Sequence, residues 1–407
     1  MIMTDNNENK VLNVPHLRFP EFSGEWEIYP LTDFMSFKNG MNPDAKRFGR
    51  GTKFISVMDI LNNQFICYDN IRASVEVVDG DIETYGVNYG DILFQRSSET
   101  LEDVGQANVY LDSKPAVFGG FVIRGKSKSN YYPMFFRYLL ASPTARKKII
   151  VKGAGAQHFN IGQDGLSKVC LNIPSIQEQE KIAKLFECID TRIATQNKII
   201  EDLKKLKSAI SQHLFSQEPN VWNRLDNLFV KGKAGGTPIS TNKEYYNGNI
   251  PFLSINDITR QGKYIWLTEK HISLNGLENS SAWIVPKHSL IMSMYASVGL
   301  VTINQVPIAT SQAMFSMLLR DKSLLDYLYY YLSYFKYRHI HKYLETGTQS
   351  NINADIVSGI MIPDYGYRHN MQIASMLQSI DMKIDNESSI LERYSQQKND
   401  LLSSLFI

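Results

Sequence analysis

The chain contains an internal duplication, and no other feature of the sequence constrains its fold as strongly. Residues 182–215 align with residues 373–406 without a gap. The matched pairs of identical residues include Ile182, Ala183, Ile189, Asp190, Ile193, Ile199, Glu201, Leu214 and Phe215 in the first copy, and Ile373, Ala374, Ile380, Asp381, Ile384, Ile390, Glu392, Leu405 and Phe406 in the second. This match predicts two copies of one structural module, and 407 residues are enough for two separate hydrophobic cores.

Shorter matches in the same order extend the repeat beyond this segment. The matched runs are Phe54–Ile60 with Phe252–Ile258, Val104-Gly105 with Val298-Gly299, and Gly155-Ala-Gln157 with Gly347-Thr-Gln349. The spacing of Phe19 and Trp26 also equals that of Phe215 and Trp222. This last match predicts a ring-like arrangement in which the second long segment returns toward the start of the chain.

Both copies of the repeated segment have the apolar periodicity of a long helix that pairs with another helix. The positions expected on this pairing face are Ile182, Ile189, Ile199, Leu203, Leu206 and Ile210 in the first copy, and Ile373, Ile380, Ile390, Tyr394 and Leu401 in the second. We expect the two helices to pair within one chain as an antiparallel coiled coil.

Polar residues interrupt both pairing faces midway, Arg192 and Gln196 in the first helix and Lys383 and Glu387 in the second. Such residues either fix the register and partner of a coiled coil or mark a kinked, locally hydrated helix, and both interpretations stay open here. At the start of the first helix, Ser175-x-x-Glu178 predicts a capping box.

Two segments of similar length outside the helices contain short β-like runs separated by Gly, Asn and Asp. The expected strands include Lys53–Val57, Asp91–Phe94, Ala116–Ile123, Pro251–Ile255, Ser289–Met292 and Leu300–Ile303. An aromatic-rich helix follows in each segment, at Met134–Leu140 and Leu324–Tyr343. We therefore expect two similar mixed α/β (α+β) globular domains with irregular sheets.

The predicted architecture is thus pseudo-two-fold, with two globular domains separated by two long helices. We place the first globular domain, with the N-terminal segment, at residues 1–173 and the first long helix at residues 174–217. The second globular domain is placed at residues 218–363 and the second long helix at residues 364–407.

Composition restricts the cellular setting more than it restricts the activity. The formal net charge is +2, so any affinity for nucleic acid must come from local patches of charge. The three cysteines, Cys67, Cys170 and Cys188, are far apart and odd in number, which argues against a disulfide framework. The polar start of the chain and the absence of a long apolar run favour a cytoplasmic protein outside the membrane.

Several motifs together give the chain a more specific resemblance. The second module opens with Lys231-Gly-Lys-Ala-Gly-Gly-Thr-Pro238, followed by Tyr245-Tyr-Asn-Gly-Asn-Ile-Pro-Phe-Leu-Ser254. The first module has Phe37-Lys-Asn-Gly40, Gly51-Thr-Lys-Phe-Ile-Ser-Val57, Gly90-Asp-Ile-Leu93 and Ile173-Pro-Ser-Ile-Gln-Glu-Gln179. From about Val14 to its end, the chain resembles the specificity subunit of type I restriction–modification enzymes. It departs from that pattern at Gly40-Met-Asn-Pro43, where Gly-Gly-Thr-Pro would stand, and in lacking Glu-Gln at the start of the second helix.

This resemblance implies two target recognition domains that each read one half of a split, asymmetric sequence in double-stranded DNA. It implies that the long helices hold these domains apart and bind two methyltransferase subunits, and that restriction–translocase subunits join the complex. It also implies that the chain is not an enzyme by itself. S-adenosylmethionine, ATP and Mg²⁺ are expected only in the partner subunits, and no metal site is expected here.

Basic residues in two glycine-containing loops are the first candidates for contacts with DNA phosphates. The first loop holds Lys38, Lys46, Arg47, Arg50 and Lys53, and the second holds Lys231, Lys233 and Lys243. The alternative is a solvated loop with scattered cations.

Forked, amide and hydroxyl side chains in loops are the candidates for base reading. In the first module these are Gln95, Arg96, Ser97, Ser98 and Gln157, and in the second Ser293, Tyr295, Ser297 and Gln349. The same loops could instead brace the sheet against a helix.

Two other classes of function remain as alternatives, a DNA-modifying enzyme active alone and a coiled-coil scaffold that binds only proteins. The chain has no Gly-x-x-x-x-Gly-Lys-Ser/Thr phosphate loop, and Asn42-Pro43-Asp44 is not the Asn-Pro-Pro-aromatic motif of adenine methyltransferases. These features favour the recognition subunit.

Overall fold

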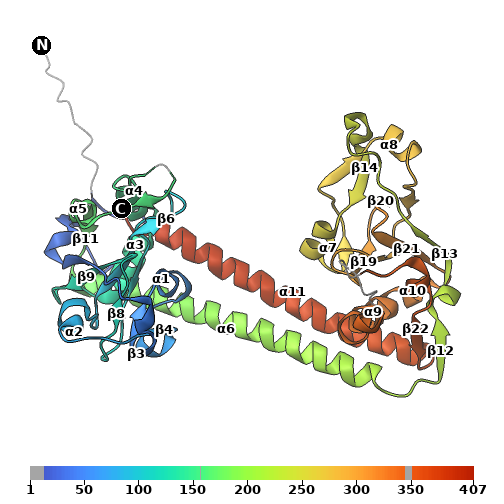
Figure 1. The fold of residues 1–407 in the computed structure, drawn as a ribbon, viewed down its shortest axis with the longest axis horizontal. Coiled ribbons are helices and arrows are strands. Elements are labelled where there is room, and N and C mark those ends of the chain that lie inside the picture. Colours follow the sequence, from blue (N-terminus) through green and yellow to red (C-terminus); the bar gives the residue numbers. More distant parts are fainter. Residues whose placement is uncertain (1–12, 156, 344–350) are drawn as a thin grey trace, which may run out of the picture. The chain divides into compact units, whose positions relative to one another are not determined.

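The computed structural model describes residues 13–155, 157–343 and 351–407, and the chain divides into two compact units. Unit 1 comprises Met1–Asn197 with Ser389–Ile407, and unit 2 comprises Lys198–Ser388. The units cut across the two predicted helical segments, because each long helix contributes one part to each unit (Figure 1).

Unit 1 contains a four-stranded sheet and a three-stranded sheet. The four-stranded sheet has the order β2 (Met35–Asn39), β9 (Val122–Ser127), β5 (Ile92–Gln95) and β7 (Ala107–Val109). The three-stranded sheet has the order β4 (Ala73–Val75), β3 (Phe48–Ile55) and β8 (Val117–Phe118). Two short pairs complete the unit, β1 (Glu27–Pro30) with β11 (Cys170–Ile173) and β6 (Ser97–Ser98) with β10 (Phe159–Asn160).

Unit 2 repeats this topology. A five-stranded sheet has the order β13 (Phe229–Ala234), β21 (Met314–Leu319), β18 (Leu290–Ser293), β19 (Val301–Asn304) and β15 (Tyr264–Ile265). A four-stranded sheet has the order β16 (Lys270–Ile272), β14 (Tyr246–Leu253), β20 (Ile308–Thr310) and β17 (Ile284–Val285), and β12 (Val221–Arg224) pairs with β22 (Met361–Asp364). The first four strands of the larger sheet correspond one by one to the four strands of unit 1, so the predicted duplication is confirmed.

The helices fall into two kinds, short helices within each unit and two long helices. The short helices are α1 (Val57–Asn62), α2 (Asp81–Tyr85), α3 (Pro133–Ala141), α4 (Pro143–Ile150), α5 (Gln163–Ser167), α7 (Ile255–Gln261), α8 (Leu274–Glu278), α9 (Leu325–Arg338) and α10 (Ala354–Ser358). The long helices are α6 (Ile176–Phe215) and α11 (Tyr367–Ser404).

Five of the six predicted strands are confirmed to within a few residues. The exception is the run 116–123, which divides into β8 and β9 at Gly119-Gly120-Phe121. A Cβ added at Gly119 would lie 2.6 Å from Cζ of Phe54, so the chain passes this ring only because it has no side chain there. The predicted helix at 324–343 is also too long, since α9 ends at Arg338.

An aromatic-rich helix forms the centre of each core, α3 in unit 1 and α9 in unit 2. The core of unit 1 packs α3 against the first turns of α6 and the last residues of the chain, including Leu405 and Phe406. The core of unit 2 packs α9 against Phe215 and the start of α11, including Ile373 and Leu377. In each unit the beginning of one long helix therefore lies in the same core as the end of the other.

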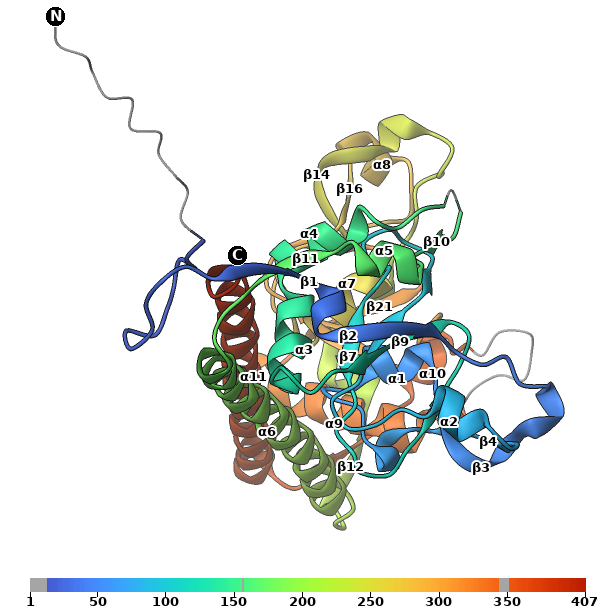
Figure 2. The same ribbon diagram turned by 90° about the vertical axis from the view of Figure 1, so that its left-hand side faces the viewer.

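The N-terminal segment that the structure describes meets the chain end in unit 1, as predicted, and Figure 2 shows the ribbon of this segment beside the C-terminal end of α11. The N–H group of Leu17 donates to the carbonyl of Ser404 at 3.0 Å, and the rings of Trp26 and Phe406 pack edge to face. The residue match behind the prediction was wrong, however, because Trp26 is 2% exposed and Trp222 is 50% exposed. In the paired strands Trp222 corresponds to Ile28, not to Trp26.

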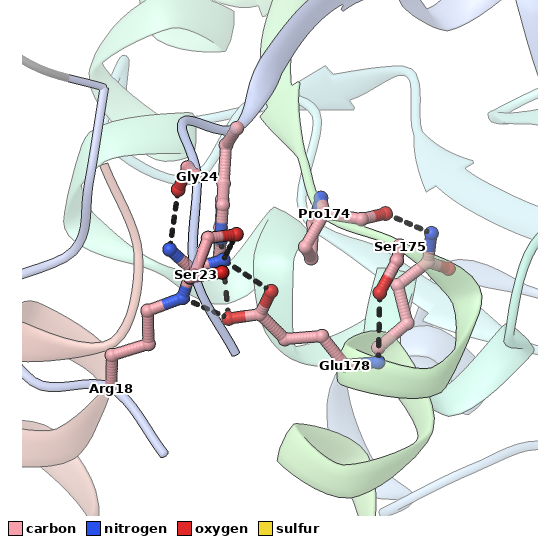
Figure 3. A network of polar contacts seen from close by, with 8 residues as sticks. Arg18, Ser23, Gly24, Pro174, Ser175 and Glu178 are labelled. Atoms are coloured by element: carbon pink, nitrogen blue, oxygen red, sulfur yellow. Dashed lines mark hydrogen bonds and ion pairs between the residues drawn. The ribbon is translucent and has the colours of Figure 1, made fainter. Parts of the chain in front are cut away.

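The start of α6 is held by side chains from the N-terminal segment (Figure 3). Ser175 Oγ accepts from the N–H group of Glu178 at 3.4 Å, which is one half of the predicted capping box. The Glu178 carboxylate instead accepts hydrogen bonds from Nε and Nη2 of Arg18, both at 2.8 Å, and from the indole N–H of Trp26 at 3.3 Å. A buried ion pair thus replaces the second half of the box.

The predicted pairing positions of the long helices do not share one environment. Ile182, Ile189 and Ile373 are buried, and Leu203, Ile210, Ile380, Tyr394 and Leu401 are half-buried. Ile199, Leu206 and Ile390 are exposed, because the helices present only part of their apolar surface to their own units. Of the polar interruptions, Gln196 and Glu387 are buried, whereas Arg192 and Lys383 are exposed.

Among the residues that the structure describes, no helix combines the length and the apolar character needed to cross a membrane.

Candidate nucleic-acid interface

The end of the central strand has the same backbone framework in both units. In unit 1, the N–H group of Arg96 donates to the carbonyl of Phe121 at 2.9 Å, and the carbonyl of Arg96 accepts from Ile161 at 2.9 Å. In unit 2, Met294 makes the corresponding bonds to Ala313 at 2.7 Å and Ile352 at 3.1 Å. These hydrogen bonds show that Arg96 of unit 1 is structurally equivalent to Met294 of unit 2, and Phe121 to Ala313.

A glycine in each unit brings a second loop against this strand end. Gly40 donates to Val122 and Met41 to Phe118, and in unit 2 Gly235 donates to Met314 and Gly236 to Thr310. A Cβ at Gly40 would lie 2.0 Å from the carbonyl oxygen of Gly119, and one at Gly235 would lie 1.9 Å from that of Thr310. Gly40-Met-Asn-Pro43 therefore occupies the place of Gly235-Gly-Thr-Pro238, as the resemblance implies.

These loops form what we call the loop edge of each unit. The loop edge of unit 1 consists of Asn42, Arg96, Ser97, Gly120, Phe121 and Asn160, and that of unit 2 of Thr237, Tyr295, Gln312, Ala313 and Asn351. Ser97 Oγ donates to Asn160 Oδ1 in unit 1, and Thr237 Oγ1 donates to Gln312 Oε1 at 2.5 Å in unit 2. The backbone framework is thus shared while the side chains differ.

Three of the predicted base-reading residues are buried beneath the loop edges. Gln95 Nε2 donates to the carbonyl of Ser97 at 2.9 Å, and Ser98 Oγ accepts from Thr100 at 3.2 Å. Ser293 Oγ donates to the carbonyl of Ser297 and accepts from Leu300. These three side chains are left out of the candidate interface because they are buried, although Oε1 of Gln95 has no hydrogen-bond partner among the described residues.

The other predicted base-reading residues lie at or near the surface. Arg96 and Ser97 are half-buried, and Gln157, Tyr295 and Ser297 are exposed. Tyr295 precedes Ala296 and Ser297, whose φ values of 39° and 54° place this loop in the left-handed region. Gln349 lies outside the described residues.

Two of the five cations in the basic loop of the first module are neutralised by neighbouring carboxylates. Arg47 forms an ion pair with Asp81, and Arg50 forms one with Glu76 at 2.7 Å. Lys53 Nζ donates to the carbonyl of Ile71 at 2.7 Å, Lys38 Nζ lies 5.3 Å from the centroid of the Tyr85 ring, and Lys46 is exposed. The structure therefore gives this loop a weaker positive field than the sequence indicates.

The basic loop of the second module is more open. Lys231, Lys233 and Lys243 are all exposed, and Lys231 Nζ lies 4.3 Å from the centroid of the Trp283 ring. Lys231 and Lys233 lie on β13, the strand that leads directly to Gly235. These two cations therefore stand beside the loop edge of unit 2.

One polar cluster occurs in both units at equivalent positions. In unit 1, Tyr138 donates to Asp190 at 2.9 Å and Lys398 forms an ion pair with Asp190. In unit 2, Tyr330 donates to Asp381 at 2.8 Å and Lys207 forms an ion pair with Asp381. Burial and the nearby carboxylate raise the pKa of each tyrosine, so the hydroxyls stay protonated donors.

Sequence reasoning missed Phe121, Asn42, Thr237 and Gln312 as loop-edge residues. The repeat offered a signal for them, since aligning Phe118–Ile123 with Thr310–Phe315 places Phe121 opposite Ala313. The Gly119-Gly120 pair, which interrupts the apolar residues of the run 116–123, was a second signal for a turn at this place.

Comparison with known proteins identifies the family. A model of the type I restriction modification DNA specificity domain matches residues 23–205 and again residues 219–393. The putative type I restriction enzyme MjaX specificity subunit of Methanocaldococcus jannaschii is 24% identical over 95% of this chain and 93% of its own length.

Two solved structures share the fold. The S subunit of a type I restriction–modification system from M. genitalium gives a TM-score of 0.57 at 14% identity, over 97% of this chain and 99% of that one. A chain from a structure of type I R-M complex assembly and conformational transition gives a TM-score of 0.60 at 13% identity, over 93% and 96%. Because the family model covers both modules, the chain belongs to the family of type I restriction–modification DNA specificity proteins.

Proposed function

We propose that this chain is the DNA sequence-recognition subunit of a type I restriction–modification complex, with one half of a bipartite, asymmetric target read by each unit. The observation that carries the proposal is the repeated framework. Arg96 and Met294 hold equivalent backbone positions, yet the loop edges around them expose different side chains. Two frameworks of one shape with different surfaces suit two half-sites of different sequence.

The residues proposed to contact DNA are those of the two loop edges, with Lys231, Lys233 and Lys243 as phosphate contacts. Exposed lysines beside a recognition loop add affinity that depends on salt and not on sequence. Gln157 and Ser297 are retained as further candidates because both are exposed. Lys46 is retained as an exposed cation of the first module.

We assign the partner contacts to apolar side chains that the long helices leave uncovered. Ile199 and Leu206 are exposed on α6, and Met376 and Met382 are exposed on α11. Exposed apolar side chains on a long helix favour a protein partner. The partners proposed are two methyltransferase subunits, joined in the full complex by restriction–translocase subunits, all in the cytoplasm.

Catalysis is assigned to those partners, along with S-adenosylmethionine, ATP and Mg²⁺. The chain itself is proposed to act as a reader and as a spacer. For this role we keep the division into a first recognition domain (1–173), a spacer helix (174–217), a second recognition domain (218–363) and a second spacer helix (364–407).

Exchange of one recognition domain tests the proposal directly. Residues 27–173 are replaced by the matching segment of another family member, and the chain is assembled with its methyltransferase partner. Sequencing of methylated adenines should show one half of the target changed and the other half kept. An unchanged target would mean that the first unit does not read DNA.

A second experiment separates the recognition subunit from an enzyme active alone. The purified chain is incubated with DNA, Mg²⁺ and S-adenosylmethionine, and methylation and cleavage are measured. We expect turnover only after the methyltransferase subunit is added. Turnover by the chain alone would contradict the assignment of catalysis to its partners.

A further inference from the structure

The loop edge of unit 1 presents an aromatic ring to solvent. Phe121 lies in the turn between β8 and β9 and is 68% exposed. The neighbouring residues Phe118, Val122 and Ile123 are all buried, so the turn itself is anchored in the cores of unit 1. The exposed ring therefore projects from a fixed base and not from a loose loop.

The backbone around Phe121 is fixed by close packing and hydrogen bonds. Its carbonyl accepts from Arg96 at 2.9 Å, and the N–H group of Val122 donates to Gly119 at 2.9 Å. A Cβ on Gly120 would lie 2.0 Å from Oδ1 of Asn42, so the Asn42 side chain lies directly against this turn. A backbone held in this way loses little additional entropy when the turn binds a ligand.

A cation contacts the backbone of the same turn. Nη1 of Arg96 donates to the carbonyl of Gly120 at 3.2 Å, one residue before Phe121. In the part of the chain that the structure describes, no carboxylate forms an ion pair with this guanidinium. A guanidinium has five N–H donors in a planar fork, so donors remain for a ligand.

Unit 2 shows that the shared framework does not need either side chain. The equivalent residues are Met294, which is buried, and Ala313, whose side chain is a single methyl group. Both units nevertheless make the same backbone hydrogen bonds at this place. Arg96 and Phe121 are therefore additions specific to the first module, and the shared backbone framework does not require them.

We propose that Arg96 and Phe121 form a base-reading pair, in which the Arg96 fork binds a guanine edge in the major groove and the Phe121 ring packs on the adjacent base pair. Arginine donating to O6 and N7 is the geometry that distinguishes guanine from the other bases. An aromatic ring beside it contributes apolar contact with a thymine methyl group or with a partly unstacked base step. This inference rests on the proposed function and adds to it the residues that read one half-site.

The test uses the full chain assembled with its methyltransferase subunit. The target is first determined by sequencing methylated adenines, and duplexes carrying each single base-pair change in either half are then compared as substrates. The variants are Arg96→Ala, Phe121→Ala and Arg96→Lys, which keeps the charge but removes the fork. Tyr89→Ala is the matched control, because Tyr89 is also exposed but precedes the start of β5, whereas Arg96 follows its end.

We expect Arg96→Ala to lower the preference for one G·C pair by about fivefold or more, and Arg96→Lys to lower it less, because an ammonium can still donate to guanine. Phe121→Ala should lower the preference at the neighbouring pair, and Tyr89→Ala should change neither. The half read by unit 2 should be unaffected in every variant, which also shows that the variants fold and assemble. Retention of the full preference at every G·C pair by Arg96→Ala would overturn the guanine contact.

Two further outcomes separate this inference from the proposed function. A normal two-part target whose preferences all survive Arg96→Ala and Phe121→Ala within about twofold overturns the reading pair alone. A wild-type complex that methylates no two-part sequence overturns the proposed function, and the reading pair with it.

Discussion

The hydroxyl of Tyr138 on α3 donates a hydrogen bond of 2.9 Å to the carboxylate of Asp190 on α6, and thereby ties the core of unit 1 to its long helix. Lys398, near the end of α11, forms an ion pair with the same carboxylate. Unit 2 repeats all three residue types, as Tyr330, Asp381 and Lys207. One carboxylate in each unit thus joins an aromatic helix and both long helices.

Removal of the Asp190 carboxylate should destabilise the protein more than removal of the Asp381 carboxylate. The side chain of Asp190 is 8% exposed and that of Asp381 is 24% exposed, so water compensates less for the loss of Asp190. We expect Asp190→Ala to lower the free energy of unfolding by about 2–4 kcal/mol, because a buried hydroxyl and a half-buried ammonium lose their acceptor. Hydrogen exchange of α3 and α9 measures the two effects separately.

Asp381→Ala is the control for Asp190→Ala. It should reduce the hydrogen-exchange protection of α9 by a smaller amount and leave the protection of α3 unchanged. A double-mutant cycle of Asp190→Ala with Lys398→Ala should give a favourable coupling energy, and additive effects would contradict a joint role.

Removal of Arg18 should loosen the start of α6. The Glu178 carboxylate is nearly buried, and Arg18→Ala would remove the two guanidinium donors and leave it the indole N–H of Trp26 at 3.3 Å. We expect a loss of about 2–3 kcal/mol, because breaking one side of a buried ion pair leaves a desolvated charge. Urea denaturation followed by Trp fluorescence would measure it.

Lys181→Ala is the matched control for this change. Lys181 pairs with Glu21 in the same region, but both side chains are well exposed. Solvent screens such a pair, so its removal should leave the urea midpoint unchanged. An equal effect of the two variants would mean that the burial of Glu178 does not matter.

Asp91 should make the stability of unit 1 depend on pH. Burial raises the pKa of this carboxyl group above its ordinary value of 3.8, although the N–H groups of Asn88 and Ser127 donate to it. The folded state therefore binds the proton more tightly than the unfolded state does. Its contribution to stability is full below pH 3.8 and is lost as the pH rises through the raised pKa.

Asp91→Asn should remove this dependence and cost about 1–2 kcal/mol, since an amide cannot accept from both N–H groups. Asp112 provides a control of opposite sign, because N–H groups of Lys114 and Tyr68 lower the pKa of its carboxyl group. The contribution of Asp112 is present above pH 3.8 and is lost as the pH falls through its lowered pKa. Urea unfolding of Asp91→Asn and Asp112→Asn would be measured across the acidic range and compared with the unsubstituted chain. If the free energy of unfolding of all three varied with pH in parallel, the pH dependence would not come from these two carboxyl groups.

Lys231 and Lys233 should contribute to DNA affinity through phosphates. Each substitution to Gln should weaken binding of the assembled complex to all sequences alike and reduce the slope of log affinity against log salt by about 0.9. Lys322→Gln is the control, since this exposed lysine lies beyond Leu319, at the end of β21 opposite to the loop edge. A change in sequence preference without a change in slope would point to base contact instead.

The sequence by itself determined the duplication, the two long helices and most strands. Apolar periodicity places Ile182 and Ile373 on a pairing face, and helical pairing faces are set by local spacing along the chain. The same reasoning predicted that the chain end returns to the chain start, which the contacts of Phe406 confirm.

Only the tertiary structure decided which side chains are available for function. Gln95 and Ser293 have suitable chemistry for reading DNA, but packing and internal hydrogen bonds cover them. The sequence predicted Phe121 inside one strand, whereas the structure places it in the turn between β8 and β9, next to the close approach of Gly119 to Phe54. Exposure and partner choice depend on residues distant in the chain, and local sequence patterns carry no record of those neighbours.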